Sequence, residues 1–238
     1  NRPEHLRRGS LANHVADQFR EAIVSLKLRP GTVLDKSEIC ARLGVSRSPV
    51  GEAMPRLKSE GLIDILPQRG TVVSLVSLGA VEDYIFVRKA LESEVVRTLA
   101  QRLPDGLIEE LNQNLHRQRE VAAQGDALAF HNLDLEFHEI LLNALNNARM
   151  KAMVDMARNN LNRARQLSNS QRRIKQGIAE HAEIVEALAS GNGDEAASMM
   201  RKHLDGVVIE IHQVARNFPQ LFTDGIIELE DGQRFWSA

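Results

Sequence analysis

The sequence predicts a mainly α-helical protein, in which a small N-terminal domain carries a pair of short strands and a larger C-terminal domain is all-α. Three observations lead to this prediction. Hydrophobic residues recur at helical spacing through most of the 238 residues. Alternation typical of strands is confined to the segment LIDILPQRGTVVSLV, residues 62–76. Only 4% of the residues are aromatic, so the cores must consist largely of Leu, Ala, Ile and Val.

Composition limits the class of protein. Hydrophobic residues make up 43% of the chain and charged residues 26%, which is typical of a globular protein with a packed core. The single cysteine, Cys40, excludes an internal disulfide framework and fits a reducing compartment. The apolar runs are too short to cross a bilayer, and the first ten residues lack the apolar core of a secretion signal. We therefore expect a cytoplasmic protein without a membrane partner.

The charge is unevenly distributed along the chain. The net charge of −2 by itself argues against binding to nucleic acid. Residues 1–75, however, contain 12 Lys and Arg against 8 Asp and Glu, while the remainder contains 18 against 24. A basic N-terminal part joined to an acidic C-terminal part is a pattern expected of a binding module attached to a second domain.

The N-terminal part contains three predicted helices followed by two strands. The first helix spans residues 11–27. A short helix in DKSEICARLG, residues 35–44, ends at Gly44, and a longer one in VSRSPVGEAMPRLKSEGL, residues 45–62, has Ser46 as its N-cap. A hairpin around PQRG follows. This order of elements is that of a winged helix-turn-helix domain.

The turn LGVSRSP between the second and third helices carries the most information. Gly44 permits the sharp reversal of the backbone, and Val45 closes the core between the two helices. Arg47 and Ser48 lie in the first turn of the third helix, which is where a recognition helix meets base edges and phosphates.

Two further places are expected to contact DNA. They are Ser37 in the second helix, and Arg69 with Gly70 at the hairpin tip, where an Arg beside a Gly suits close approach to a groove. The alternative is a small helical domain with ordinary surface arginines.

From Leu78 to about Asn217 the pattern is helical throughout, and we predict a bundle of six or seven helices. Six of them are expected over residues 79–102, 105–124, 126–146, 148–167, 171–190 and 194–216. The predicted organisation is a DNA-binding domain at 1–75, a linker at 76–80, the helical domain at 81–217 and a tail of unassigned role at 218–238.

The predicted bundle carries an unusual set of polar residues on inward-looking positions. Asp134 and His138 lie four residues apart on one helix and share a face, while His181 and His203 lie among apolar residues on two later helices. Facing helices of a bundle are a common place for a metal site. One Asp and three His suit zinc, and nickel, iron or manganese as alternatives. The competing interpretation is that these are core histidines satisfied by local partners. Within the metal-site hypothesis, His131 lies on the same face as Asp134 and is a possible substitute ligand.

The N-terminal segment LRPGTVLDKSEICARLGVSRSPVGEAMPRLKSEGLIDILPQRGTVVS, residues 28–74, closely resembles the DNA-binding domain of GntR-type bacterial transcription regulators. The remainder resembles the FCD effector-binding domain of the FadR-like branch, and the whole resemblance covers residues 11–216. It implies a homodimeric repressor that binds a palindromic operator and responds to a small organic acid. It also implies that Asp134, His138, His181 and His203 bind a divalent metal ion, zinc first.

The resemblance further implies arginines that bind the carboxylate of the effector. Arg88 on the first bundle helix is the first candidate, although a surface Arg paired with Glu92 is the simple alternative. The segment ARNNLNRARQ, residues 157–166, offers several more polar side chains, from which we select Asn160 and Arg163; Arg165 in the same segment stays an alternative.

The chain departs from the family pattern in the recognition helix. The family usually has Arg where this chain has Gly51, and Pro55 follows four residues later. A proline inside a helix cannot bond to the carbonyl four residues earlier and crowds it. We therefore expect a kinked recognition helix that lacks one DNA-reading side chain.

Four functions are compatible with these features. A ligand-responsive transcription regulator is the leading hypothesis, and we do not expect an enzyme. A direct metal sensor, a metalloenzyme in which the ion activates water, and an interaction protein whose bundle only dimerises are the alternatives. Phosphate-binding glycine loops and dinucleotide fingerprints are absent from the sequence.

Overall fold

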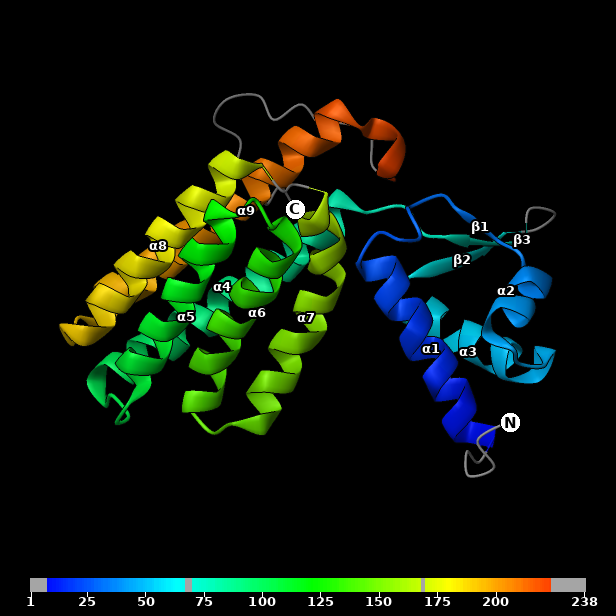
Figure 1. The fold of residues 1–238 in the computed structure, drawn as a ribbon. Coiled ribbons are helices and arrows are strands. Elements are labelled where there is room, and N and C mark those ends of the chain that lie inside the picture. Colours follow the sequence, from blue (N-terminus) through cyan, green and yellow to red (C-terminus); the bar gives the residue numbers. More distant parts are fainter. Residues whose placement is uncertain (1–7, 67–69, 168–169, 224–238) are drawn as a thin grey trace, which may run out of the picture.

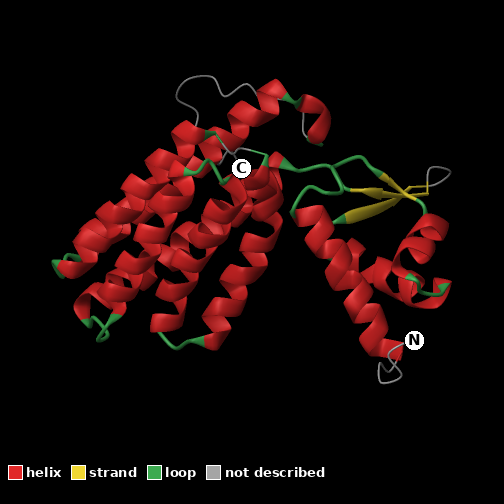
Figure 2. Cartoon of the chain, in the orientation of Figure 1, coloured by secondary structure: helices red, strands yellow, loops and turns green. Residues whose placement is uncertain are grey.

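The computed structural model describes residues 8–66, 70–167 and 170–223, and in these ranges the protein is mainly α-helical, as predicted. The chain forms a smaller part that contains the sheet and a larger helical bundle (Figure 1). Helices dominate both parts, and the strands are confined to the smaller one (Figure 2). No helix among the described residues is long and apolar enough to cross a membrane.

The smaller part has the predicted winged helix-turn-helix order. Its elements are α1 (Arg8–Val24), β1 (Val33–Leu34), α2 (Lys36–Leu43), α3 (Arg47–Ser59), β2 (Ile63–Leu66) and β3 (Gly70–Val73). The strands form an antiparallel sheet in the order β1-β3-β2, in which Ile63 pairs with Val73 and Leu66 with Gly70. A core of buried residues from all three helices and the sheet holds this domain together.

Two details differ from the sequence prediction. The sheet has a third strand, because Val33 and Leu34 pair with β3; two residues are too few for alternation to be visible in the sequence. The first helix ends at Val24 rather than at residue 27, because Leu26 adopts a left-handed conformation with φ of 59°. The turn before α3 follows the prediction, with Gly44 at φ of 63° and Val45 against the core.

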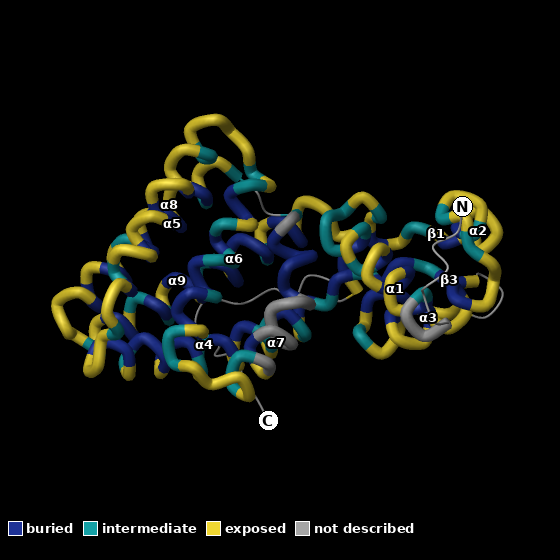
Figure 3. Tube along the Cα trace, turned by 60° about the horizontal axis from the view of Figure 1, so that its bottom comes forward, coloured by how far each residue is buried: buried dark blue, intermediate teal, exposed yellow. Residues whose placement is uncertain are grey.

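The larger part is a bundle of six helices in the described residues. They are α4 (Leu78–Gln101), α5 (Leu107–Ala123), α6 (Ala127–Ala144), α7 (Ala148–Gln166), α8 (Gln171–Ala189) and α9 (Gly193–Asn217). Their bounds agree with the predicted ranges to within a few residues, because polar N-caps such as Ser77, Asp126 and Ser170 mark most of the starts. Buried residues follow the inner faces of these helices (Figure 3).

The segment between the two domains is held by the end of the chain. After α9 a short 3₁₀ helix, Pro219–Leu221, leads to Phe222, which is buried in the bundle core and forms an isolated parallel bridge with Val76. The Val76 N–H donates to the Leu221 carbonyl at 2.9 Å, and the Thr223 N–H donates to the Val76 carbonyl at 3.0 Å. The predicted linker is therefore paired at Val76, its residues from Leu78 onward belong to α4, and Leu221 and Phe222 of the predicted tail pack in the bundle core.

Candidate metal centre and DNA-binding face

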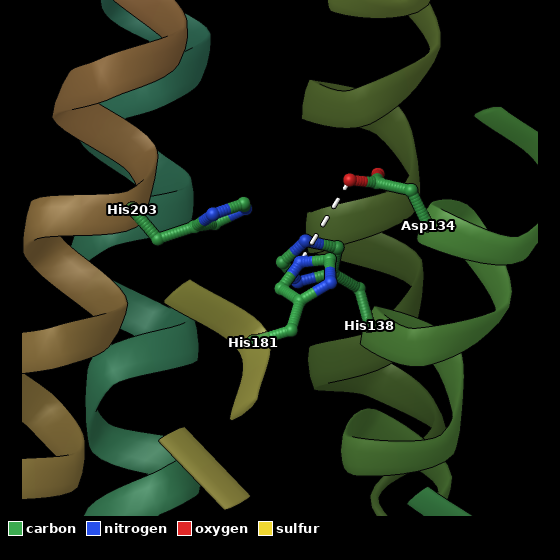
Figure 4. A group of neighbouring side chains, drawn as sticks. All are labelled: Asp134, His138, His181 and His203. Carbon is green, nitrogen blue, oxygen red and sulfur yellow. Dashed lines mark ion pairs between the residues drawn. The ribbon is translucent and has the colours of Figure 1, made fainter. Parts of the chain in front are cut away.

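Four buried side chains from three helices converge in the bundle. Asp134 and His138 come from α6, His181 from α8 and His203 from α9, and each offers one ligand atom within 4.8 Å of the others. All four side chains point toward one region between the helices (Figure 4). The structure thus brings together all four residues that the sequence singled out. Metal ions in bundle cores are bound by sets of this kind.

The Nδ1 atom of each imidazole faces an oxygen atom of a neighbouring polar side chain. The distances are 2.7 Å from His138 Nδ1 to Glu92 Oε2, 3.1 Å from His181 Nδ1 to Gln118 Oε1 and 2.9 Å from His203 Nδ1 to Glu180 Oε2. A carboxylate can only accept a hydrogen bond, so Glu180 places the ring proton of His203 on Nδ1. Metal-binding histidines in proteins are usually oriented in this way. At His138 the contact with Glu92 is an ion-pair distance without hydrogen-bond geometry.

A chain of hydrogen bonds fixes the tautomer of His181. The Asn114 amide donates to the Leu133 carbonyl at 3.1 Å, which leaves Asn114 Oδ1 to accept from the Gln118 amide at 2.6 Å. Gln118 Oε1 therefore faces His181 as an acceptor, and His181 Nδ1 must donate. Phe137 stacks on the His181 ring with centroids 4.0 Å apart and limits its rotation. His181, like His203, therefore presents an Nε2 lone pair.

The cluster contains several buried ring nitrogens without a hydrogen-bond partner among the described residues, namely all three Nε2 atoms and Nδ1 of His138. Nε2 of His138, His181 and His203 is buried and has no hydrogen-bond partner among the described residues. Leaving one buried polar atom unsatisfied costs about 1–3 kcal/mol, and three such atoms within one cluster are hard to explain in a protein core. A satisfied core histidine would use both of its nitrogens. The residues therefore fit a divalent cation that accepts the three lone pairs, with Asp134 as the fourth ligand.

Burial keeps the imidazoles neutral at physiological pH. It lowers the pKa of His138 and His181 below the ordinary value, and that of His203 to about 4. Burial alone would raise the pKa of Asp134, but the Arg165 guanidinium and the neighbouring histidines hold it well below its usual range. Neutral imidazoles and an ionised carboxylate are the protonation states in which these side chains bind metals.

Asp134 is also the partner of a buried arginine. Arg165 Nη1 and Nη2 donate to the two carboxylate oxygens at 2.6 and 2.7 Å. Such a bidentate pair fixes the carboxylate firmly. It also places a positive charge next to the candidate metal position, so a bound cation and Arg165 would share the same two oxygen atoms.

A cavity opens beside the cluster. Asp134 and His203 form one part of its lining, and the charged residues Arg165, Arg173 and Glu210 form another. The apolar part consists of Phe130, Ile174 and Val207. His131, the predicted substitute ligand, also lines this cavity but is outside the four-residue cluster. The cavity could hold a small acid against both the arginines and the candidate metal position.

Two of the three residues predicted to bind the effector, Arg88 and Arg163, do not line this cavity. Arg88 points inward, but its Nε donates to Glu92 Oε1 at 2.6 Å and the residue does not line the cavity. Arg163 points toward the N-terminal domain. The side chain of Asn160 lies outside the described part of the structure.

Sequence reasoning missed the partners that orient the cluster. Glu92 and Gln118 lie on α4 and α5, far from the histidines in sequence, and Glu180 precedes His181 directly. The signal for Glu92 was its place four residues after Arg88, which was considered only as an alternative, exposed ion pair; the structure buries both side chains almost completely. Arg165 was one of several polar residues in its segment, and no sequence pattern indicated that Arg173 would line the cavity.

We predict that Glu92→Gln weakens zinc binding by about 10–100-fold, which is the usual cost of losing a partner that orients a metal-binding histidine. The amide keeps the volume but removes the carboxylate charge that lies 2.7 Å from His138 Nδ1. Competition titration of the full chain with a zinc-binding dye measures the effect. Glu94→Gln, an exposed neighbour on α4, is the matched control. Equal affinities in the two variants would contradict the assigned role of Glu92.

The predicted DNA-contacting residues that the structure describes are all exposed. Arg47 and Ser48 are exposed at the start of α3, and Arg47 Nη2 is 3.4 Å from the hydroxyl of exposed Ser37 on α2. Gly70 is exposed at the start of β3 with φ of 81°, a conformation that favours glycine. Arg69 lies outside the described residues.

The recognition helix continues as one helix past Pro55 to Ser59. Both Pro55 and Gly51 are exposed, and a Cβ atom on Gly51 would meet nothing within 4 Å. Ser46 is the N-cap residue as predicted, although its side chain makes no capping hydrogen bond. The helix therefore has room for a longer side chain at position 51 on its exposed surface.

Comparison with known proteins identifies the family. The profile of the bacterial regulatory proteins of the gntR family matches residues 11–73, and that of the FCD domain matches residues 83–206. An uncharacterized HTH-type transcriptional regulator from an unstable DNA locus of Streptomyces ambofaciens is 33% identical over 207 residues, which is 86% of each chain. The HTH-type transcriptional repressor RspR of Escherichia coli strain K12 is 30% identical over 87% of this chain and 91% of that protein.

A solved structure supports the same assignment. The GntR transcriptional regulator from Rhodococcus sp. RHA1 matches with a TM-score of 0.73 and 25% identity, over 84% of this chain and 96% of that one. The chain therefore belongs to the GntR family of bacterial regulatory proteins with an FCD domain, and it is a DNA-binding transcription regulator rather than an enzyme.

Proposed function

We propose that this regulator binds a palindromic operator as a homodimer in the cytoplasm, and that a small carboxylate bound at a metal ion in the bundle controls this binding. The observation that carries the proposal is the set of three buried, unpartnered Nε2 atoms around Asp134. Zinc is the first candidate for the ion, with nickel, iron and manganese as alternatives, because imidazole and carboxylate ligands suit all four.

The cavity supports a carboxylate as the effector. Arg165 and Arg173 line it together with Asp134 and His203. Guanidinium groups bind carboxylates in a fork geometry, and four protein ligands leave one or two positions on a five- or six-coordinate ion for the acid. We therefore assign the effector to these two arginines. Arg88 would act through Glu92 and His138, as part of the metal site.

We base repression on the name of a relative, and dimerisation on the two-fold symmetry with which helix-turn-helix proteins bind DNA. The E. coli relative is named a transcriptional repressor, and we extend that role to this chain. Helix-turn-helix proteins read two half-sites about one DNA turn apart through a two-fold dimer. Light scattering should accordingly give twice the chain mass of 26.6 kDa.

The test begins with an operator selected from a random DNA pool by the full-length protein. Binding to this operator is then measured in the presence of a panel of small mono-, di- and tricarboxylates. We expect at least one acid to weaken binding about 5–150-fold, the usual range for a regulatory coupling. Removal of the metal with a chelator should abolish that response. An acid that acts equally well on the metal-free protein would refute the metal-assisted site.

A direct metal sensor is the second candidate, because Arg165 and a bound cation would share the oxygens of Asp134. In that case zinc alone would change operator affinity, and dialysis would reverse the change. A metal that survives dialysis and leaves operator affinity unchanged favours the carboxylate-responsive regulator.

A further inference from the structure

The base of the wing sheet is held by a side chain from the bundle. Arg163 on α7 donates from Nη2 to the Ser74 carbonyl and from Nη1 to the Gly61 carbonyl, the latter at 3.5 Å. Gly61 precedes β2 and Ser74 follows β3, and the Ser74 N–H donates to the Leu62 carbonyl at 3.1 Å. Arg163 therefore binds the N-terminal domain at the point where its sheet runs into the linker.

Arg163 makes this contact as a buried cation. Only 4% of the residue is exposed. Burial lowers the pKa of Arg163 to about 10, while the negative charge of Asp64 on β2 acts in the opposite direction. The guanidinium therefore stays protonated at neutral pH. Hydrogen bonds from a charged donor are stronger than neutral ones, and their loss would leave a buried charge without partners.

The same turn of α7 binds the candidate metal centre. Arg165, two residues after Arg163, donates both Nη atoms to Asp134. Residues two apart on an α-helix point about 200° apart around the axis, so the two guanidinium groups reach opposite sides of α7. On one side α7 packs on α4 and α6, and on the other it contacts α1 of the N-terminal domain (Figure 1).

The linker has little freedom to absorb a shift of α7. Its backbone at Val76 is paired with Leu221 and Thr223 on one side, and Arg163 holds Ser74 on the other. A displacement of the last turn of α7 would consequently reach the wing sheet.

We propose that Arg163 and Arg165 together couple the occupancy of the Asp134 cluster to the docking of the DNA-binding domain. A cation at the cluster attracts the carboxylate oxygens of Asp134 and repels the Arg165 guanidinium, so the bidentate pair loosens. The last turn of α7 then shifts, and Arg163 loses its hydrogen bonds to the carbonyl groups of Gly61 and Ser74. As a result, the N-terminal domain is released from the bundle. This coupling rests on the proposed metal site and adds to it the route by which occupancy reaches the DNA-binding domain.

Hydrogen–deuterium exchange of the full-length protein, with zinc as the probe, tests this route without a known operator. In the wild type, zinc should speed the exchange of amides in residues 61–74 about fivefold or more, the lower end of typical coupling. In Arg163→Met these amides should exchange rapidly with or without zinc, and zinc should bind at least about fivefold more tightly than to wild type, because the coupling between the two sites is reciprocal. Arg149→Met, an exposed position on the same helix, should behave as wild type.

A metal-free arm tests the link between the two arginines separately. Arg165→Lys keeps a positive charge beside Asp134, so the protein should still fold. A lysine cannot form the two parallel hydrogen bonds to the carboxylate that the guanidinium forms. Without zinc, its residues 61–74 should exchange faster than those of Arg149→Met. Unchanged exchange in Arg165→Lys, or zinc binding to wild type with no effect on residues 61–74, would overturn the coupling. Failure of the wild type to bind zinc would instead overturn the metal site. The metal-free comparison of Arg165→Lys with Arg149→Met would still test whether Arg165 affects the contact of Arg163 with the N-terminal domain.

Discussion

Replacing His181 with Ala is expected to abolish zinc binding. The wild-type chain, purified without a metal-binding tag and dialysed, should retain about one zinc ion per chain, and the variant should retain none. His181 is fully buried at the centre of the cluster, its ring lies between Phe137 and the other histidines, and Nε2 is 3.8 Å from Asp134 Oδ1. Loss of this ligand leaves two imidazoles and one carboxylate, too few to close a four-ligand site.

Thermal unfolding gives a second readout of the same variant. Zinc at about 1,000 times its dissociation constant stabilises a protein that binds only when folded by about 4 kcal/mol. For a chain of this length that corresponds to a rise in unfolding temperature of roughly 10 °C. The rise should be absent in His181→Ala. Elemental analysis and a melting curve with and without added zinc measure both effects.

The matched control is His116→Ala, which removes an exposed histidine on α5. It should keep the metal content and the zinc-dependent rise of the wild type. A wild-type protein that contains no metal and whose unfolding temperature is unmoved by zinc or nickel would show that the cluster is a set of core histidines. The three unpartnered Nε2 atoms would then require another explanation.

The sequence allowed much of this site to be predicted, for a physical reason. Asp134 and His138 are four residues apart on one helix, and helical spacing alone places them on one face. His181 and His203 each lie within an apolar stripe, so their burial followed from periodicity. The elements themselves were visible because polar caps and glycines mark their ends.

The rest of the site depends on tertiary packing, which periodicity does not determine. Arg163 and Arg165 are two residues apart on α7, and which of them faces the bundle depends on how α7 sits against α6 and α1. The prediction selected Arg163, whereas Arg165 lines the cavity. Arg88 was expected to point inward, with a surface pair to Glu92 as the alternative, and periodicity gave Glu92 itself no place beside the cluster. Likewise, the strand Val33–Leu34 exists only because β3 lies beside it.

Gly51→Arg is expected to increase operator affinity by about 5–150-fold, which corresponds to the 1–3 kcal/mol of one good contact to a base. Position 51 lies on the exposed surface of α3, one turn after Arg47 and Ser48, so an arginine there extends the same DNA-facing row. A Cβ atom at Gly51 meets nothing within 4 Å, so the new side chain needs no rearrangement of the domain. Binding to the selected operator, measured by fluorescence anisotropy, gives the affinity.

The salt dependence of binding separates a new DNA contact from a general change in charge. If the new arginine contacts a phosphate, the slope of log affinity against log salt should steepen by about 0.9 for each chain bound. Gln18→Arg adds the same charge on the exposed side of α1 and should change the slope less, with little gain in affinity. Equal effects of the two substitutions would show that position 51 does not face the operator.

Pro55 provides the remaining control, because it acts on the same turn without adding a charge. Proline has no N–H to donate to the Gly51 carbonyl, and a helix interior loses about 3 kcal/mol at such a residue when nothing compensates. Pro55→Ala should therefore raise the free energy of unfolding of the N-terminal domain and leave the salt slope unchanged. If Pro55→Ala alone raised operator affinity as much as Gly51→Arg, the proline in α3 rather than the missing side chain would limit DNA binding. A gain confined to Gly51→Arg, with a steeper slope, locates the deficit in the side chain itself.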